Sequence, residues 1–145
     1  MPYMWADTLQ AAERAHLLRL LAWAAASILT GTAVLAWLRV KDVRSDLLRH
    51  FSIQAAAWGT VIAVAAAWQL PHLAPRDIAA ATRLDRMLWL YVGLGVGAVA
   101  VGVTLVVLGW RLERRLALVG AGMGVIVQGG ALALLGLILA GQISR

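Results

Sequence analysis

The fold is decided by residues 116–144, which read LALVGAGMGVIVQGGALALLGLILAGQIS and contain no Asp, Glu, Lys, Arg or His. An α-helix needs about 20 such apolar residues to cross the hydrocarbon core of a bilayer. Three more charge-free runs precede this one, over 20–38, 51–70 and 87–110. They do not alternate in polarity, as the strands of an outer-membrane barrel do. The sequence therefore predicts four spanning helices, the last of them over 116–141.

Short segments connect these runs, over 39–50, 71–86 and 111–115. Such short links favour antiparallel neighbours. We therefore expect an all-α integral membrane protein, an antiparallel four-helix bundle with up-down-up-down topology, in which residues 1–145 form one domain. Residues 7–19 are expected to form an interfacial helix that continues into the first span.

Two local signals concern helix starts. Asp7 or Thr8 is a plausible N-cap for the first helix, because a short side-chain oxygen can accept from the free backbone N–H groups there. Pro75 followed by a charged pair and alanines is a start signal for the third helix, near Arg76.

The composition agrees with a membrane protein: 62% of residues are hydrophobic, 14% are charged, and the mean hydropathy is +0.81. A soluble domain would be roughly half apolar. The net charge of +6 comes from basic residues in the connections, which favours contact with anionic lipid headgroups over nucleic acid. The expected headgroup contacts are Arg39, Lys41, Arg44, Arg111, Arg114 and Arg115. Because these loops are dense in positive charge, we expect them in the cytoplasm.

Small residues recur every four positions within the spans, and such spacing forms a groove in which another helix backbone can approach closely. The expected packing residues are Ala55, Gly59, Ala63, Ala67, Gly93, Gly97, Gly120 and Gly124. Two interpretations stay open. The grooves either close a monomeric bundle, or one of them is a surface for a second copy or another subunit.

Polar residues inside the spans are few, and none of them is Asp or Glu. Ion-coupled carriers usually place an ionisable residue near mid-membrane, so the sequence disfavours that class. Gln128 lies at the middle of the fourth span, and Thr30, Thr32 and Thr60 lie near the middle of the first two. We expect one midplane polar layer, which either fixes helix register or forms a small polar binding site.

Catalytic and cofactor signals are missing from the sequence. There is no cysteine, and His50 lies on the opposite side of the bundle from His16 and His72. A histidine pair on neighbouring helices can ligate haem iron, but these residues lie in headgroup-level flanks. The sequence therefore predicts no catalytic residue, no metal and no cofactor.

The third and fourth spans resemble a family of uncharacterised small bacterial membrane proteins with four helices. The resemblance covers about the last 60 residues, and it departs at Gly59 and Gly136, where the family has Asn and Asp. The residues that carry it are Leu84, Asp85, Tyr91, Val92, Gly93, Gly95, the stretch 120–124 (GAGMG), Gln128 and Gly129. It implies four spans and no activity.

These features predict a multi-pass protein of the bacterial cytoplasmic membrane. Its expected role is that of a structural or accessory subunit, with the lipid bilayer, a second copy or other membrane subunits as partners. The alternative is a small transporter or channel subunit for a neutral or apolar solute, whose path Gln128 and the threonines would line.

Overall fold

A computed structural model describes residues 4–143, and these form four long helices without a strand. The elements in chain order are α1 (Met4–Val40), α2 (Asp46–Gln69), the short 3-10 helix η1 (Leu70–His72), α3 (Ile78–Arg111) and α4 (Leu116–Ile143). Each of the four long helices is long and apolar enough to cross a membrane. The predicted all-α four-helix bundle is confirmed.

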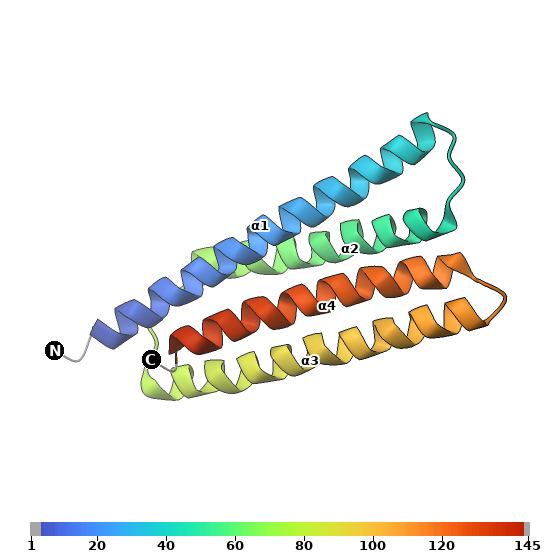
Figure 1. The fold of residues 1–145 in the computed structure, drawn as a ribbon. Helices are drawn as coiled ribbons and strands as arrows, with labels where there is room; N and C mark the ends of the chain where they lie inside the picture. Colours follow the sequence, from blue (N-terminus) through green and yellow to red (C-terminus); the bar gives the residue numbers. More distant parts are fainter. Residues whose placement is uncertain (1–3, 144–145) are drawn as a thin grey trace.

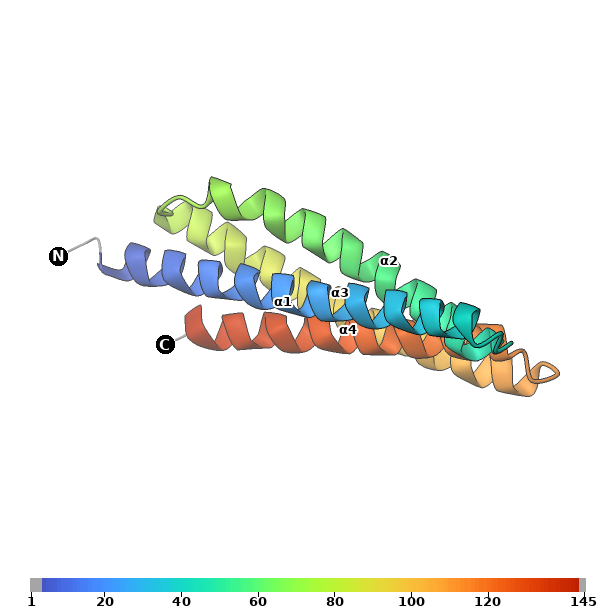
Figure 2. The ribbon, with the colours of Figure 1, turned by 90° about the horizontal axis from the view of Figure 1, so that it is seen from above.

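The helices run alternately up and down, and they pack in the order α1, α2, α4, α3 (Figures 1 and 2). Helix α4 is the centre of this arrangement: it packs against α3 and α2 and also touches α1. Helix α3 lies at the edge and packs almost wholly against α4. The start of α1 and the end of α4 lie at the same end of the bundle, called the terminal end below (Figure 1). The loop end carries the links 41–45 and 112–115.

Two helices begin at side-chain caps. The Ser45 hydroxyl accepts from the backbone N–H of Leu48 at 3.3 Å at the start of α2. The Asp77 carboxylate accepts from the backbone N–H of Ala80 at 2.7 Å at the start of α3. Each cap satisfies a backbone donor that the first turn of a helix leaves free. The start signal near Arg76 thus marks a real helix start.

The expected cap of the first helix is wrong. Asp7 and Thr8 lie inside α1, which begins at Met4. The Thr8 hydroxyl donates to the Trp5 carbonyl of its own helix at 2.8 Å. A residue that can cap a helix can also bond inside one, so its presence does not fix the boundary.

Tight turns close the two hairpins at the loop end. Asp42 has a φ of 49° after α1, and Glu113 and Arg114 have φ values of 50° and 53° between α3 and α4. This left-handed conformation reverses the chain within a few residues, and Asp tolerates it better than most side chains do. The turns hold α1 against α2 and α3 against α4 as antiparallel pairs.

Helices α1 and α3 are longer than a membrane is thick. They have 37 and 34 residues. At a rise of about 1.5 Å per residue they measure about 55 and 51 Å, against about 30 Å for the hydrocarbon core. Their excess carries charge at the terminal end, at Glu13, Arg14 and Arg19 in α1 and at Arg83 and Arg86 in α3. Residues 7–19 are therefore the first part of an unbroken helix.

The extension of α1 is packed onto the bundle. Leu9 and Leu17 are buried on the same face of α1. Leu88, Leu139 and Ala140 form a buried apolar cluster where α3 meets the end of α4, and Ala12 of α1 packs against it. This cluster therefore joins three helices at the terminal end.

Candidate functional site

The side chain of Gln128 connects α4 to α1. Its amide oxygen accepts from the Trp23 indole N–H at 2.9 Å, and its amide nitrogen donates to the Ser27 hydroxyl at 3.1 Å. The Gln128 side chain is 4% exposed. A buried amide without partners is costly, so the two contacts give this face of α1 a fixed register on α4.

The predicted midplane layer is wrong in its other members. Thr30, Thr32 and Thr60 are exposed on the outside of the bundle. The Thr32 hydroxyl donates to the Ile28 carbonyl at 2.7 Å, and that of Thr60 donates to the Ala56 carbonyl at 2.8 Å. A threonine in a helix can satisfy its hydroxyl on its own backbone, so nothing draws it inward.

The two partners of Gln128 were missed in the sequence. Trp23, Ser27 and Gly31 are each four residues apart, so they share one face of α1. Ser27 and Gly31 are both buried, and a Cβ at Gly31 would lie 2.6 Å from the Ser52 carbonyl oxygen. This spacing was the signal that could have placed Ser27 inside.

Glycines seven residues apart form the seam between α3 and α4. An added Cβ at Gly102 would lie 2.7 Å from the Gly122 carbonyl oxygen, and one at Gly122 would lie 2.6 Å from the Gly102 carbonyl oxygen. Gly95 and Gly129 face each other in the same way, with corresponding distances of 2.8 and 2.7 Å. A Cβ does not fit at such distances, so the two backbones touch. The seven-residue repeat keeps this seam facing the partner helix over several turns.

Several predicted packing residues lie at contacts with other helices. Gly59 approaches the Ala24 carbonyl of α1, and Gly120 and Gly124 approach Leu47 and Gln54 of α2. Of the alanines, Ala55 is buried, Ala63 is half-buried and Ala67 is exposed. Only some of the predicted packing residues therefore lie between helices of the same chain.

Gly93 and Gly97 do not pack within the chain. Both are exposed, and a Cβ at either would meet none of the described residues within 4 Å. With Ala100 and Thr104, which are also exposed, they form a stripe that we call the outer stripe of α3. At 100° per residue this stripe points away from the Gly95 and Gly102 side of the helix. The interpretation in which this groove closes the bundle within one chain is therefore wrong at Gly93 and Gly97, since α4 takes the opposite face of α3. The interpretation in which it is a surface for a partner stays open.

A buried carboxylate holds the terminal end together. Arg76 donates to Glu13 through Nε at 2.7 Å and through Nη2 at 2.8 Å. The Glu13 side chain is 7% exposed and that of Arg76 is 35% exposed. This two-point geometry is the strong form of an ion pair, and the hydrogen bond to Glu13 raises the pKa of Arg76. Glu13 stands four residues from both Leu9 and Leu17, a spacing that could have revealed its burial.

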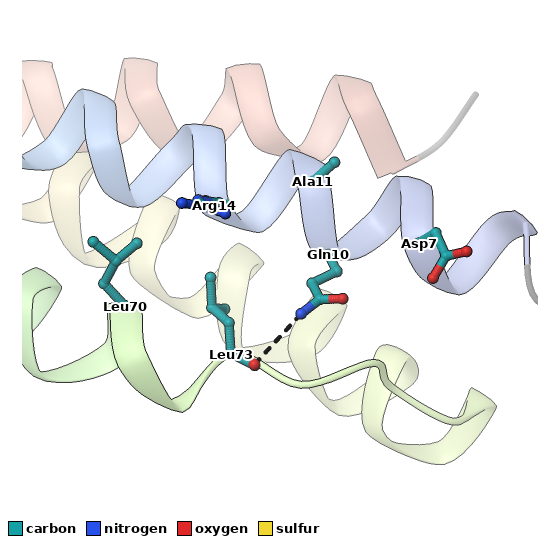
Figure 3. A pocket seen from close by; sticks show the side chains of 6 residues that line it. All are labelled: Asp7, Gln10, Ala11, Arg14, Leu70 and Leu73. Atoms are coloured by element: carbon teal, nitrogen blue, oxygen red, sulfur yellow. Dashed lines mark hydrogen bonds between the residues drawn. The ribbon is translucent and has the colours of Figure 1, made fainter.

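An open pocket of about 440 Å³ lies between α1 and the segment after α2 (Figure 3). The Gln10 side chain reaches from α1 to the opposite wall of the pocket, where its amide nitrogen donates to the Leu73 carbonyl at 3.4 Å. Asp7 and Arg14 also line the pocket. Together with Glu13 and Arg76, these contacts fasten the segment 73–77 to α1.

The loop end is basic. All six predicted headgroup residues are exposed there, and the Arg114 guanidinium carbon lies 5.2 Å from the centre of the Trp110 ring. Residues 4–143 contain no group of three or more His, Asp or Glu side chains placed to hold a metal ion.

The sequence matches the profile of a protein family. The profile of a family of unknown function, DUF6992, covers residues 19–137. The chain belongs to DUF6992. No curated protein and no solved structure matches the sequence.

The DUF6992 match agrees with the expectation of an uncharacterised family and reaches further than the last 60 residues. It includes Trp23, Ser27 and Gln128 and the glycine seam. Glu13 lies outside the matched region, and its partner Arg76 lies inside it. Membership supplies no activity.

Proposed function

We propose that this DUF6992 protein is a structural or accessory subunit of a complex in the bacterial cytoplasmic membrane, and that it associates through the outer stripe of α3. The observation that supports this role is the open space at Gly93 and Gly97, on a helix that packs almost wholly against α4. Small residues let a second helix backbone approach closely, and in lipid such packing drives helix association.

The occupant that we propose is a second copy of this chain, with another membrane subunit as the alternative. Two α3 helices with the same stripe can pack against each other about a two-fold axis, which is the commonest symmetry of oligomers. We place the loop end in the cytoplasm, because positive charge is dense in its short links.

The polar side chains that were expected at mid-membrane give the transporter hypothesis less support. A path for a neutral solute needs polar groups that face it. The Gln128 amide is instead buried and paired with Trp23 and Ser27, and the nearby Thr32 and Thr60 hydroxyls are bonded to their own helices.

Native-size measurement tests the proposed role. The full chain, extracted in mild detergent and also reconstituted in nanodiscs, should be larger than a monomer by native mass spectrometry. The double substitution of Gly93 and Gly97 by Leu should reduce it to a monomer. It should leave the fold intact, since both positions face open space.

The matched control replaces Val96 and Val103 by Leu, because these exposed residues of α3 lie beside the stripe and not on it. The control should keep the size of the wild type. A wild-type chain that is monomeric in both environments, or a Gly93→Leu and Gly97→Leu variant of unchanged size, contradicts the proposal.

A further inference from the structure

A groove opens between α1 and α2 at the loop end. The two helices diverge toward their link (Figure 1), and the space between them has a volume of about 750 Å³. That volume lies within the range of small-molecule sites, about 300–1,000 Å³. Its lining includes both the last residues of the charge-free run 20–38 and the charged residues that follow, so we place it at the border between hydrocarbon and headgroups.

The walls of the groove differ in chemistry along its length. Leu35, Leu38 and Val43 give it an apolar part, and Arg39, Arg44 and Arg49 give it a cationic part. None of the three guanidinium groups has a hydrogen bond or an ion pair with any residue that the structure describes. The one acidic residue of the lining is Asp46.

The positions of two of these arginines are unfavourable without an anion. Arg44 precedes the Ser45 cap of α2, and Arg49 follows in the next turn. The start of a helix is the positive end of its dipole, so cations are repelled there and anions are attracted. Asp46 offsets this in part. An anion in the groove would meet three guanidinium groups and the helix start together.

We propose that this groove binds one anionic phospholipid of the surrounding bilayer. Its phosphate would lie between Arg39, Arg44 and Arg49, since guanidinium groups suit the geometry of phosphate oxygens. An acyl chain would run along Leu35 and Leu38 toward the membrane interior. The site is separate from the outer stripe of α3, so it does not depend on the proposed assembly.

Thermal unfolding of the full chain tests the site. The melting temperature should be higher in nanodiscs that contain phosphatidylglycerol than in nanodiscs of phosphatidylcholine alone, since a ligand of the native state stabilises it. Replacing Arg44 and Arg49 by Gln should remove this difference. The affinity for phosphatidylglycerol should fall at least about tenfold, because each lost charged contact is worth about a factor of ten. Native mass spectrometry, which counts the lipid molecules that the protein retains, measures this loss.

The matched control replaces Arg111 and Arg115 by Gln, which removes the same charge from the other link of the loop end. It should keep the difference between the two lipids. If both double variants lose the difference equally, surface charge explains it and the site is refuted. If neither loses it, the site is also refuted.

Two further experiments test whether the ligand is a lipid or a free anion, and whether the shape of the groove matters as well as its charge. Inorganic phosphate added to phosphatidylcholine nanodiscs should not raise the melting temperature. A rise equal to that with phosphatidylglycerol would overturn the assignment to a lipid.

Ala36→Trp places a large side chain in the groove without changing its charge, and Ala36 is exposed there. It should lower phosphatidylglycerol retention while leaving the melting temperature in phosphatidylcholine unchanged. Undiminished retention would overturn the proposal.

Discussion

The Trp23 indole N–H donates to the Gln128 amide oxygen at 2.9 Å, across 105 positions of sequence. This contact joins the first helix to the last, which otherwise touch at fewer positions than the neighbouring pairs do. With Ser27 on the other end of the amide, α1 is held to α4 by directed polar bonds as well as by packing.

Gln128→Leu should lower stability by about 1 kcal/mol, the typical worth of one interhelical polar contact in a membrane. The Trp23 N–H would lose its acceptor, whereas the Ser27 hydroxyl can turn to its own helix. Thermal unfolding in a fixed detergent measures the change. Trp23→Phe should add little to it, because both changes remove the same bond between Trp23 and Gln128. Full additivity of the two would contradict a shared contact.

Two adjacent glycines on α4 should respond differently to one methyl group. Gly129→Ala places a Cβ 2.7 Å from the Gly95 carbonyl oxygen, so it should cost about 1–3 kcal/mol as the seam opens. The nearest atom to a Cβ at Gly130 is Val99 Cγ2 at 4.0 Å, so Gly130→Ala should be neutral or stabilising by up to about 1 kcal/mol. Equal melting temperatures for the two variants would be inconsistent with this seam.

Glu13→Gln should destabilise the terminal end. It removes the charge that pairs with Arg76, and a hydrogen bond between charged groups contributes about 1.5–3 kcal/mol, less where one partner is partly exposed. Amide hydrogen exchange should become faster in the segment 73–77, which the pair fastens to α1. Glu113→Gln is the control in an exposed turn and should leave that exchange unchanged.

The chain contains no cysteine, so single introduced cysteines report its topology cleanly. Cysteines in place of the exposed residues Asp7 and Gln142 should react with an impermeant reagent from one side of sealed vesicles. A cysteine in place of Arg114 should react from the other side. Labelling of positions 7 and 142 from opposite sides would contradict the up-down-up-down order.

The number and type of the helices could be predicted, because a charge-free run of about 20 residues has few other solutions in lipid. The start of α3 could be located as well, since Pro75 and Asp77 combine a breaker with a cap. The start of α1 could not be located, because Asp7 and Thr8 are equally compatible with a cap and with a helix interior.

The inward faces were harder to predict than the helices. In a chain this apolar, hydrophobicity does not separate a lipid-facing side from a protein-facing one, and small residues stand on both. A four-residue repeat pointed to Gly93 and Gly97, whereas α4 uses the seven-residue repeat of Gly95 and Gly102. Gln128 was placed correctly as a buried polar group, but its partners required the rotation of α1, which only the packed structure gives.

Because α1 and α3 are longer than α2 and α4, the two ends of the bundle differ in how far they extend. At the terminal end the first turns of α1 and α3 exceed the length that the hydrocarbon core needs, and the ion pair between Glu13 and Arg76 fastens the start of α1 to the segment before α3. At the loop end the chain turns within a few residues, because the links 41–45 and 112–115 are short. A water-soluble protein on the terminal side would therefore meet the first turns of two helices, whereas one on the other side would meet the short links 41–45 and 112–115.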